Sequence, residues 1–143
     1  MNTLHDQDFH LWASQQAHLL RAGRLHDLDV DDLIEELEEM SGSHRRELIN
    51  RLGVLIAHLL KWQFQPAARS SSWVGTIKEQ RRKLNRLLRE NPSLKNITPD
   101  KISDAYGDAL AIVEKDTGLN ETNFPELCPF TIVQILDESF WSA

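Results

Sequence analysis

Four polar side chains in this 143-residue sequence have types that could form a binding or reaction site. They are Glu36, His58, Gln80 and Arg81. Gln80 falls within an apolar helical stripe, where an unpaired buried amide would cost on the order of 1–3 kcal/mol. The pattern therefore predicts polar partners for Gln80, and a Glu–His–Gln–Arg cluster could supply them. Such a cluster could bind a ligand or perform chemistry, or it could be a buried network that fixes the helix register.

The elements that would bring these side chains together are two predicted helices on either side of Pro66. The first covers about 44–64 and is apolar over much of its circumference, which is typical of a central buried helix. Pro66 ends it, and a second helix follows at about 72–90. Because the connecting loop is short, we expect an antiparallel hairpin that places His58 near Gln80 and Arg81, with Trp62 near Trp73 as supporting aromatics.

Further helices are predicted on both sides of this hairpin. The predicted ranges are about 8–22, 30–40 and 99–117, with a short helix at 132–138. Ser41-Gly42-Ser43 is interpreted as a break, so that an edge of the 30–40 helix can bring Glu36 to the cluster. Thr98-Pro99 is a start signal, and Thr131 with Gln134 has capping-box spacing. Phe140 and Trp141 are expected to fold back as a hydrophobic latch.

The sequence as a whole predicts an all-α protein. We expect a compact single-domain bundle of five to six helices over residues 1–143, with the hairpin at its centre. Ala105 and Ala109 are small enough to allow another helix to approach closely. Lys61, by contrast, is predicted to lie on the surface.

Known catalytic and cofactor motifs are absent from the sequence. There is no glycine-rich phosphate loop, no Ser nucleophile elbow and no HExxH. A metal site would need His58 together with Glu36 or Glu38 and perhaps His18, which lack the Glu-x-x-His spacing of helical-bundle sites. We therefore expect no metal and no cofactor, and leave open whether the protein is an enzyme while favouring a non-enzymatic role. Cys128, the single cysteine, is interpreted as a small buried hydrophobic residue.

Charge and targeting signals bear on partners and location. The net charge of −6 does not favour nucleic-acid binding. The first residues lack the basic start and apolar run of a signal peptide, and no segment has the apolar length of a membrane span. These features predict a cytoplasmic protein that does not enter a membrane.

Two charged helix faces could meet a partner. Residues 27–39 contain eight acids and no Lys or Arg, with Glu36 and Glu38 at the two edges of an apolar stripe. The face is either solvated or meets cations, of this chain or of a partner. The 72–90 helix carries a basic face that could contact phosphates or could simply neutralise the acids. That basic face consists of Lys78, Arg81, Arg82, Lys83, Arg86 and Arg89.

Nearly the whole chain resembles a known family. The segments that carry the resemblance are DFHLWASQQAHLLRAGRLHDLDVDDLIEELEEM, EELEEMSGSHRRELINRLGVLIAHLLKWQFQP, SSSWVGTIKEQRRKLNRLLRENPSL and CPFTIVQILDESFW. Over about 6–141 the chain is similar to the bacterial domain of unknown function family twenty-nine. The resemblance implies a compact all-α domain with no assigned activity. The family-like positions are Glu36, Met40, His58, Lys61, Trp62, Gln63, Trp73, Thr76, Gln80 and Arg81.

Three functions remain as hypotheses. The first is a small helical protein that acts through protein–protein interaction or self-association, in a regulatory or antitoxin-like role. The second is a ligand-binding or enzymatic bundle that uses Glu36, His58, Gln80 and Arg81, with or without a metal. The third and weakest is nucleic-acid binding through the basic face of helix 72–90.

Overall fold

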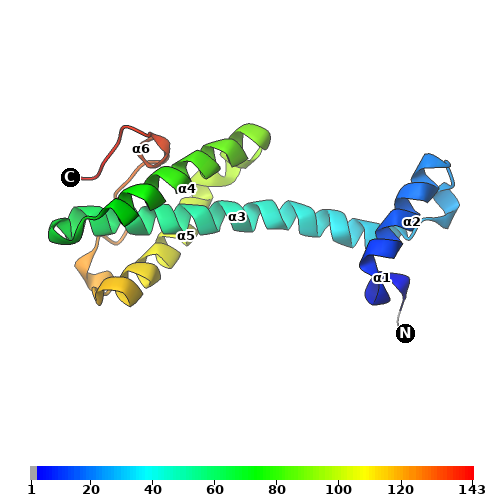
Figure 1. Cartoon of the computed structure of the whole chain (residues 1–143), viewed down its shortest axis with the longest axis horizontal. Helices are drawn as coiled ribbons and strands as arrows, with labels where there is room; N and C mark the ends of the chain where they lie inside the picture. The colour runs from blue at the N-terminus through cyan, green and yellow to red at the C-terminus, as the bar shows by residue number, and fades with distance from the viewer. Residues whose placement is uncertain (1–2) are drawn as a thin grey trace. The chain divides into compact units, whose positions relative to one another are not determined.

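Helices account for nearly all the regular structure of the protein (Figure 1). A computed structural model describes residues 3–143, and no strand occurs within that range. The chain divides into two compact units, residues 1–43 and 44–143, and helix α3 contributes to both. The helices are α1 (Leu4–Gln7), α2 (Phe9–Arg21), α3 (Val30–Phe64), α4 (Ser71–Glu90), α5 (Leu94–Thr117) and α6 (Ile132–Leu136), with 3₁₀ turns at Leu25–Asp27, Pro66–Ala68 and Glu121–Asn123.

Side-chain caps set several of the helix ends, including the capping box that the sequence predicted on the last helix. The Asp8 carboxylate accepts a hydrogen bond from Leu11 N at 3.0 Å and starts α2. The Ser70 hydroxyl does the same for α4, and Thr131 and Gln134 form a reciprocal capping box on α6. Gly118 ends α5 with φ of 79°, a left-handed conformation that glycine adopts without steric cost.

The predicted break at Ser41-Gly42-Ser43 is wrong, because α3 passes through these residues as one continuous helix. A single interior glycine costs only about 1 kcal/mol relative to alanine, and no proline is present to remove a backbone donor. Strong helix formers on both sides, from Glu35 to Met40 and from Arg45 onward, outweigh that cost.

Two other helix starts also differ from expectation. A short first helix, α1, begins at Leu4, ahead of the first predicted helix at about 8–22. Helix α5 begins at Leu94, so Pro99 lies inside it instead of at its first position. The Thr98 hydroxyl donates to the Leu94 carbonyl at 2.7 Å and therefore does not cap the helix.

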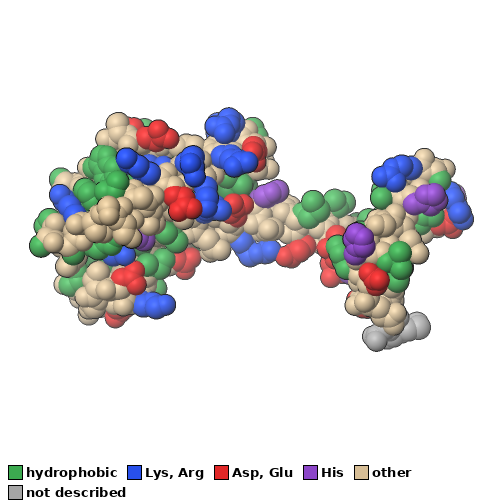
Figure 2. All heavy atoms as spheres, viewed as in Figure 1, with side chains coloured by type: hydrophobic (Ala, Val, Ile, Leu, Met, Phe, Trp, Pro, Cys, Tyr) green, Lys and Arg blue, Asp and Glu red, His purple; other side chains and the backbone are tan. Residues whose placement is uncertain are grey.

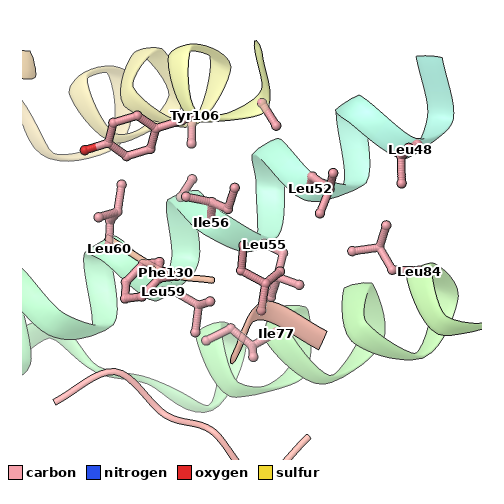
Figure 3. Packing of buried hydrophobic residues seen from close by; sticks show 14 of the residues in the cluster. Leu48, Leu52, Leu55, Ile56, Leu59, Leu60, Ile77, Leu84, Tyr106 and Phe130 are labelled. Atoms are coloured by element: carbon pink, nitrogen blue, oxygen red, sulfur yellow. The ribbon is translucent and has the colours of Figure 1, made fainter. Parts of the chain in front are cut away.

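The core of the C-terminal unit is built around the second half of α3 (Figure 3). Leu84 of α4 lies beside Leu48 and Leu52, whereas Ile77 lies beside Leu55 and Leu59, so the hairpin is antiparallel as predicted. Helix α5 approaches α3 closely at Gly53. A Cβ built there would lie 3.5 Å from the Ala105 carbonyl oxygen, so the prediction of a close approach at Ala105 is confirmed.

Two cations, Lys61 and Arg81, are buried in this unit, and each donates a hydrogen bond to a group from a distant part of the chain. Lys61 was predicted to lie on the surface, but its side chain is only 5% exposed. Its ammonium donates to Asp116 Oδ2 at 3.0 Å and lies 5.2 Å from the centroid of Trp73. A long aliphatic stem allows lysine to occupy a core-facing position if its charged end finds such a partner. The pairing with Lys61 holds the pKa of Asp116 below its usual value of 3.8.

The C-terminal segment packs back onto the hairpin, as the predicted latch requires. The rings of Trp62 and Trp141 lie 4.9 Å apart, centroid to centroid. Ser142 donates its hydroxyl hydrogen to the Leu59 carbonyl at 2.6 Å. Phe140 packs against Phe130.

The Lys61–Asp116 pair gives a stability prediction. Replacing Asp116 with Asn leaves the buried ammonium with a weaker partner, and we expect the free energy of unfolding to fall by about 1–2 kcal/mol, given that Asp116 is partly exposed. Lys61→Met removes the charge and keeps the stem, so its cost should be smaller than that of Asp116→Asn. Urea unfolding of both variants, with Asp100→Asn as a surface control, measures the difference. An Asp116→Asn variant as stable as the control would show that the pair contributes nothing.

Candidate interaction surface

The first half of α3 exposes an apolar stripe to solvent (Figure 2). Val30, Ile34, Leu37 and Met40 are 54%, 48%, 64% and 61% exposed, and Leu33 on the same face is half-buried. These residues recur at spacings of three and four and therefore share one helix face. Side chains of this size and spacing normally pack against another helix.

Acidic side chains border this stripe. At 100° per residue, Asp31 and Glu38 lie along one edge and Glu36 along the other. The acidic run of residues 27–39 contains eight acids and no Lys or Arg. The exposed part of α3 is therefore an apolar seam in a negative surround, which we call the acidic seam.

A polar network joins α2 to the start of α3 in the N-terminal unit. The Asp29 carboxylate accepts hydrogen bonds from Trp12 Nε1 at 2.8 Å and Gln16 Nε2 at 3.4 Å. The Gln16 amide oxygen in turn accepts from Asp29 N at 2.9 Å. The Asp29 backbone carbonyl accepts the first hydrogen bond of α3, from Leu33 N. Its carboxylate, however, holds α2 in place.

His5 joins α1 to α3 beside the acidic seam. Its Nε2 lies 2.6 Å from Glu36 Oε1, and its Nδ1 lies 3.7 Å from Asp32 and 3.6 Å from Asp6. The ring packs edge-on against Trp12, with centroids 4.5 Å apart. The hydrogen bond to Glu36 and the surrounding carboxylates raise the pKa of His5 above its usual value of 6.5.

The N-terminal unit buries few apolar side chains of its own. Among its described residues Trp12 is the one hydrophobic side chain that is fully buried. Eight of the eleven large exposed hydrophobic side chains of residues 3–143 lie in this unit. They are Phe9, Leu11, Leu20, Leu25, Val30, Ile34, Leu37 and Met40. This concentration exceeds the scattered apolar exposure that is normal for a protein surface.

The four residues of the predicted polar cluster each have partners of their own. Glu36 pairs with His5, as described above. His58 Nδ1 lies 2.8 Å from the Val54 carbonyl oxygen, one turn earlier in its own helix. The Gln80 amide oxygen accepts from Arg51 Nη1 at 3.2 Å.

Arg81, the fourth member, is a structural clamp. Its side chain is 1% exposed, and it donates to the carbonyl oxygens of Ile135 at 2.8 Å and Gln134 at 3.3 Å. Its guanidinium carbon lies 5.8 Å from the centroid of Trp141. Arg81 thus holds α6 and the C-terminal segment onto α4.

The supporting aromatics Trp62 and Trp73 lie in the C-terminal unit beside cations. Arg69 lies over Trp62 at 4.7 Å, and Lys61 lies near Trp73. The clustering prediction required a turn at Ser41–Ser43 that would return Glu36 toward His58. The structure has helix at those residues, so that turn is not formed.

The surroundings of His58 shift the pKa of its imidazole. Burial lowers its pKa below 6.5, and the nearby Lys61 charge adds to the effect.

No group of His, Cys, Asp and Glu within residues 3–143 has an arrangement that could hold a metal ion. No helix in the described range has the length and apolar character to cross a membrane.

Part of the basic face of α4 is neutralised on its own helix. Lys83 pairs with Glu79 at 2.6 Å and Arg86 with Glu90 at 3.2 Å, both one turn apart.

Cys128 is half-buried and packs against the core, and burial raises the pKa of its thiol.

Comparison with protein-family models gives one match, the domain of unknown function DUF29, over residues 4–141. The chain belongs to this family. No curated protein matches it. No solved structure matches it either.

The acidic seam itself was visible in the sequence, but its exposure was not. The spacing of Val30, Leu33, Ile34, Leu37 and Met40 predicted an apolar face, and composition alone does not say whether another part of the same chain covers it. The acids on both edges were the available signal, because residues that pack inside a bundle are seldom bordered by uncompensated charge.

The two histidines should titrate on opposite sides of 6.5. We expect NMR titration of the imidazole Cε1 protons to give His5 a pKa above 6.5 and His58 a pKa below it. His5 protonation stabilises the folded state, and this contribution is complete below pH 6.5 and is lost as the pH rises through its folded pKa. Glu36→Gln should return the pKa of His5 toward 6.5 and leave that of His58 unchanged. Equal values for both histidines would contradict the described geometry.

Proposed function

We propose that the protein is a helical interaction protein whose N-terminal unit binds a basic amphipathic helix of another protein through the acidic seam. The observation that carries the proposal is the exposure of Val30, Ile34, Leu37 and Met40 on one face bordered by acids. A binding module of this kind suits a small regulatory or antitoxin-like protein.

The spacing of the seam supports a helical partner. Val30, Leu33, Leu37 and Met40 follow the alternating three- and four-residue spacing through which two helices interlock side chains. Burying one leucine side chain contributes about 1.5–3 kcal/mol, so a seam of this length can sustain specific binding. An extended strand would not match the spacing, because its side chains repeat every two residues.

The charge supports a basic partner. With Val30 and Leu37 at a positions and Leu33 and Met40 at d positions, Glu36 lies at a flanking g position, and Asp31 and Glu38 lie one position outside the seam. Lys or Arg at the facing positions of a partner helix would form ion pairs, whereas Asp or Glu would repel. The acidic border also disfavours a second copy of this chain on the same face, since its own seam carries the same acids.

Designed peptides test the proposal directly. Two peptides of about three heptads would have Leu at the a and d positions, with flanking positions all Lys in one and all Glu in the other. We expect the Lys peptide to bind with a Kd of about 1–10 μM that weakens as salt is added. The Glu peptide should not bind. Fluorescence anisotropy of labelled peptides measures both.

Substitutions assign the binding to the seam. Leu37→Asp should weaken the Lys peptide by about tenfold to a hundredfold, as expected for the loss of one buried leucine. Leu127→Asp is a matched control, because Leu127 is equally apolar, 77% exposed and in the C-terminal unit. Circular dichroism should show both variants folded. Equal binding of the two peptides, or a Leu37-dependent dimer in sedimentation, would overturn the assignment of a basic helical partner.

A further inference from the structure

A cleft in the C-terminal unit lies between α4, α5 and α6. Its volume is about 770 Å³, within the range of about 300–1,000 Å³ that is typical of small-molecule sites. Every residue that lines it belongs to residues 85–138, so this cleft is separate from the acidic seam.

The cleft exists because polar groups hold one of its walls. Arg81 and Asn85 of α4 donate to the carbonyl oxygens of Gln134, Ile135 and Leu136, at the end of α6. These bonds fix α6 on α4 through side-chain bridges. The cleft lies next to these bridges, and Asn85 and Leu136 belong to its lining.

The opposite wall is the first part of α5, where Pro99 interrupts the helical hydrogen bonds. Proline has no N–H, so the carbonyl of Lys95, four residues earlier, lacks its usual helical donor. Both Lys95 and Pro99 line the cleft. This wall therefore combines the apolar ring of Pro99 with a backbone carbonyl that lacks its usual helical donor.

The lining combines an apolar floor with two cations. Leu88, Ile132 and Leu136 supply hydrophobic surface from α4 and α6. Arg89 and Lys95 are exposed cations contributed by two different helices. Within residues 3–143 no ion pair engages either of them.

One carboxylate, Glu138, also lines the cleft. It lines a neighbouring hollow as well, together with Lys78, Arg81 and Arg82. Glu138 is one of the groups that raise the pKa of Arg81 against the effect of burial. The lining of the cleft therefore carries two cations, Arg89 and Lys95, and one carboxylate.

We propose that this cleft binds a small amphipathic anion, with its apolar chain against Leu88, Ile132 and Leu136 and its acidic head group between Arg89 and Lys95. Burial of the ligand's apolar tail would favour binding. The ligand's acidic head group would form charge-assisted hydrogen bonds with both cations. An uncharged molecule would use the floor alone, and a cation would meet Arg89 and Lys95 as like charges.

Three ten-carbon probes separate these cases: decanoate, 1-decanol and decylammonium. They are titrated into the full-length protein while backbone amide NMR signals are followed. We expect decanoate to bind with a Kd of about 0.1–1 mM, with the largest shifts at residues 85–89 and 95–99. 1-Decanol should bind at least about tenfold more weakly, which corresponds to about 1.4 kcal/mol, and decylammonium should not bind.

Charge reversal tests the head-group site. Arg89→Glu combined with Lys95→Glu should weaken decanoate at least about tenfold and allow decylammonium to bind. Arg86→Glu is the matched control, because Arg86 is a 69% exposed cation of the same helix that does not line the cleft. It should leave decanoate binding unchanged. Absence of decanoate binding at about 5 mM, equal binding of all three probes, or decanoate binding that survives the double reversal would each overturn the proposal.

Discussion

The burial of α3 from Leu48 to Leu60 is the constraint on which the C-terminal unit depends. Leu48, Leu52, Leu55, Ile56 and Leu59 are inaccessible to solvent, and they point in several directions around the helix axis. A helix that is apolar over so much of its circumference must be covered on all those sides. Helix α4 covers one side, α5 covers another through the close approach at Gly53, and the C-terminal segment with Trp141 and Ser142 completes the enclosure.

The same constraint explains why the polar residues of the hairpin are structural. The charged side chains of Arg81 and Lys61 are buried, and each forms a hydrogen bond with a group from a distant part of the chain. Arg81 donates to backbone carbonyls at the C-terminal end of α6, where carbonyl oxygens lack the usual donor four residues later. Lys61 donates to a carboxylate of α5. Buried cations with fixed partners can favour one arrangement of helices over others of similar hydrophobic content.

The helices and the hairpin could be predicted from the sequence because periodicity and caps are local signals. Asp8, Ser70, Thr131 and Gly118 act where their types indicated. The errors arose where a local signal competed with a larger one. The Ser41-Gly42-Ser43 signal was outweighed by the helix formers around it, and Pro99 was accommodated inside α5 because a proline near a helix start removes few bonds.

The turn at Ser41–Ser43 on which the predicted polar cluster relied is not formed, and Glu36, His58, Gln80 and Arg81 each have a partner outside the set. Lys61 was misplaced because a charge on a helix edge says nothing about a carboxylate many residues later in the chain. The exposure of the seam and the cleft beside α6 depend on how elements meet in space. The cleft has no signature that a single sequence displays, and the acids at the edges of the seam are the one signal of its exposure.

Helix α3 therefore has two apolar segments, one buried and one exposed, and charge explains the difference. From Leu48 onward few acids interrupt the apolar surface, and the chain's own helices cover it. From Val30 to Met40 the apolar residues are as large, but the acids on both edges would be costly to bury without cations beside them. A basic helix is the chemistry that covers such a face and neutralises its border in one step. In the proposed complex with a basic helix, the acids that disfavour burial of this face within the chain would also select its partner, so exposure and specificity would have the same physical cause.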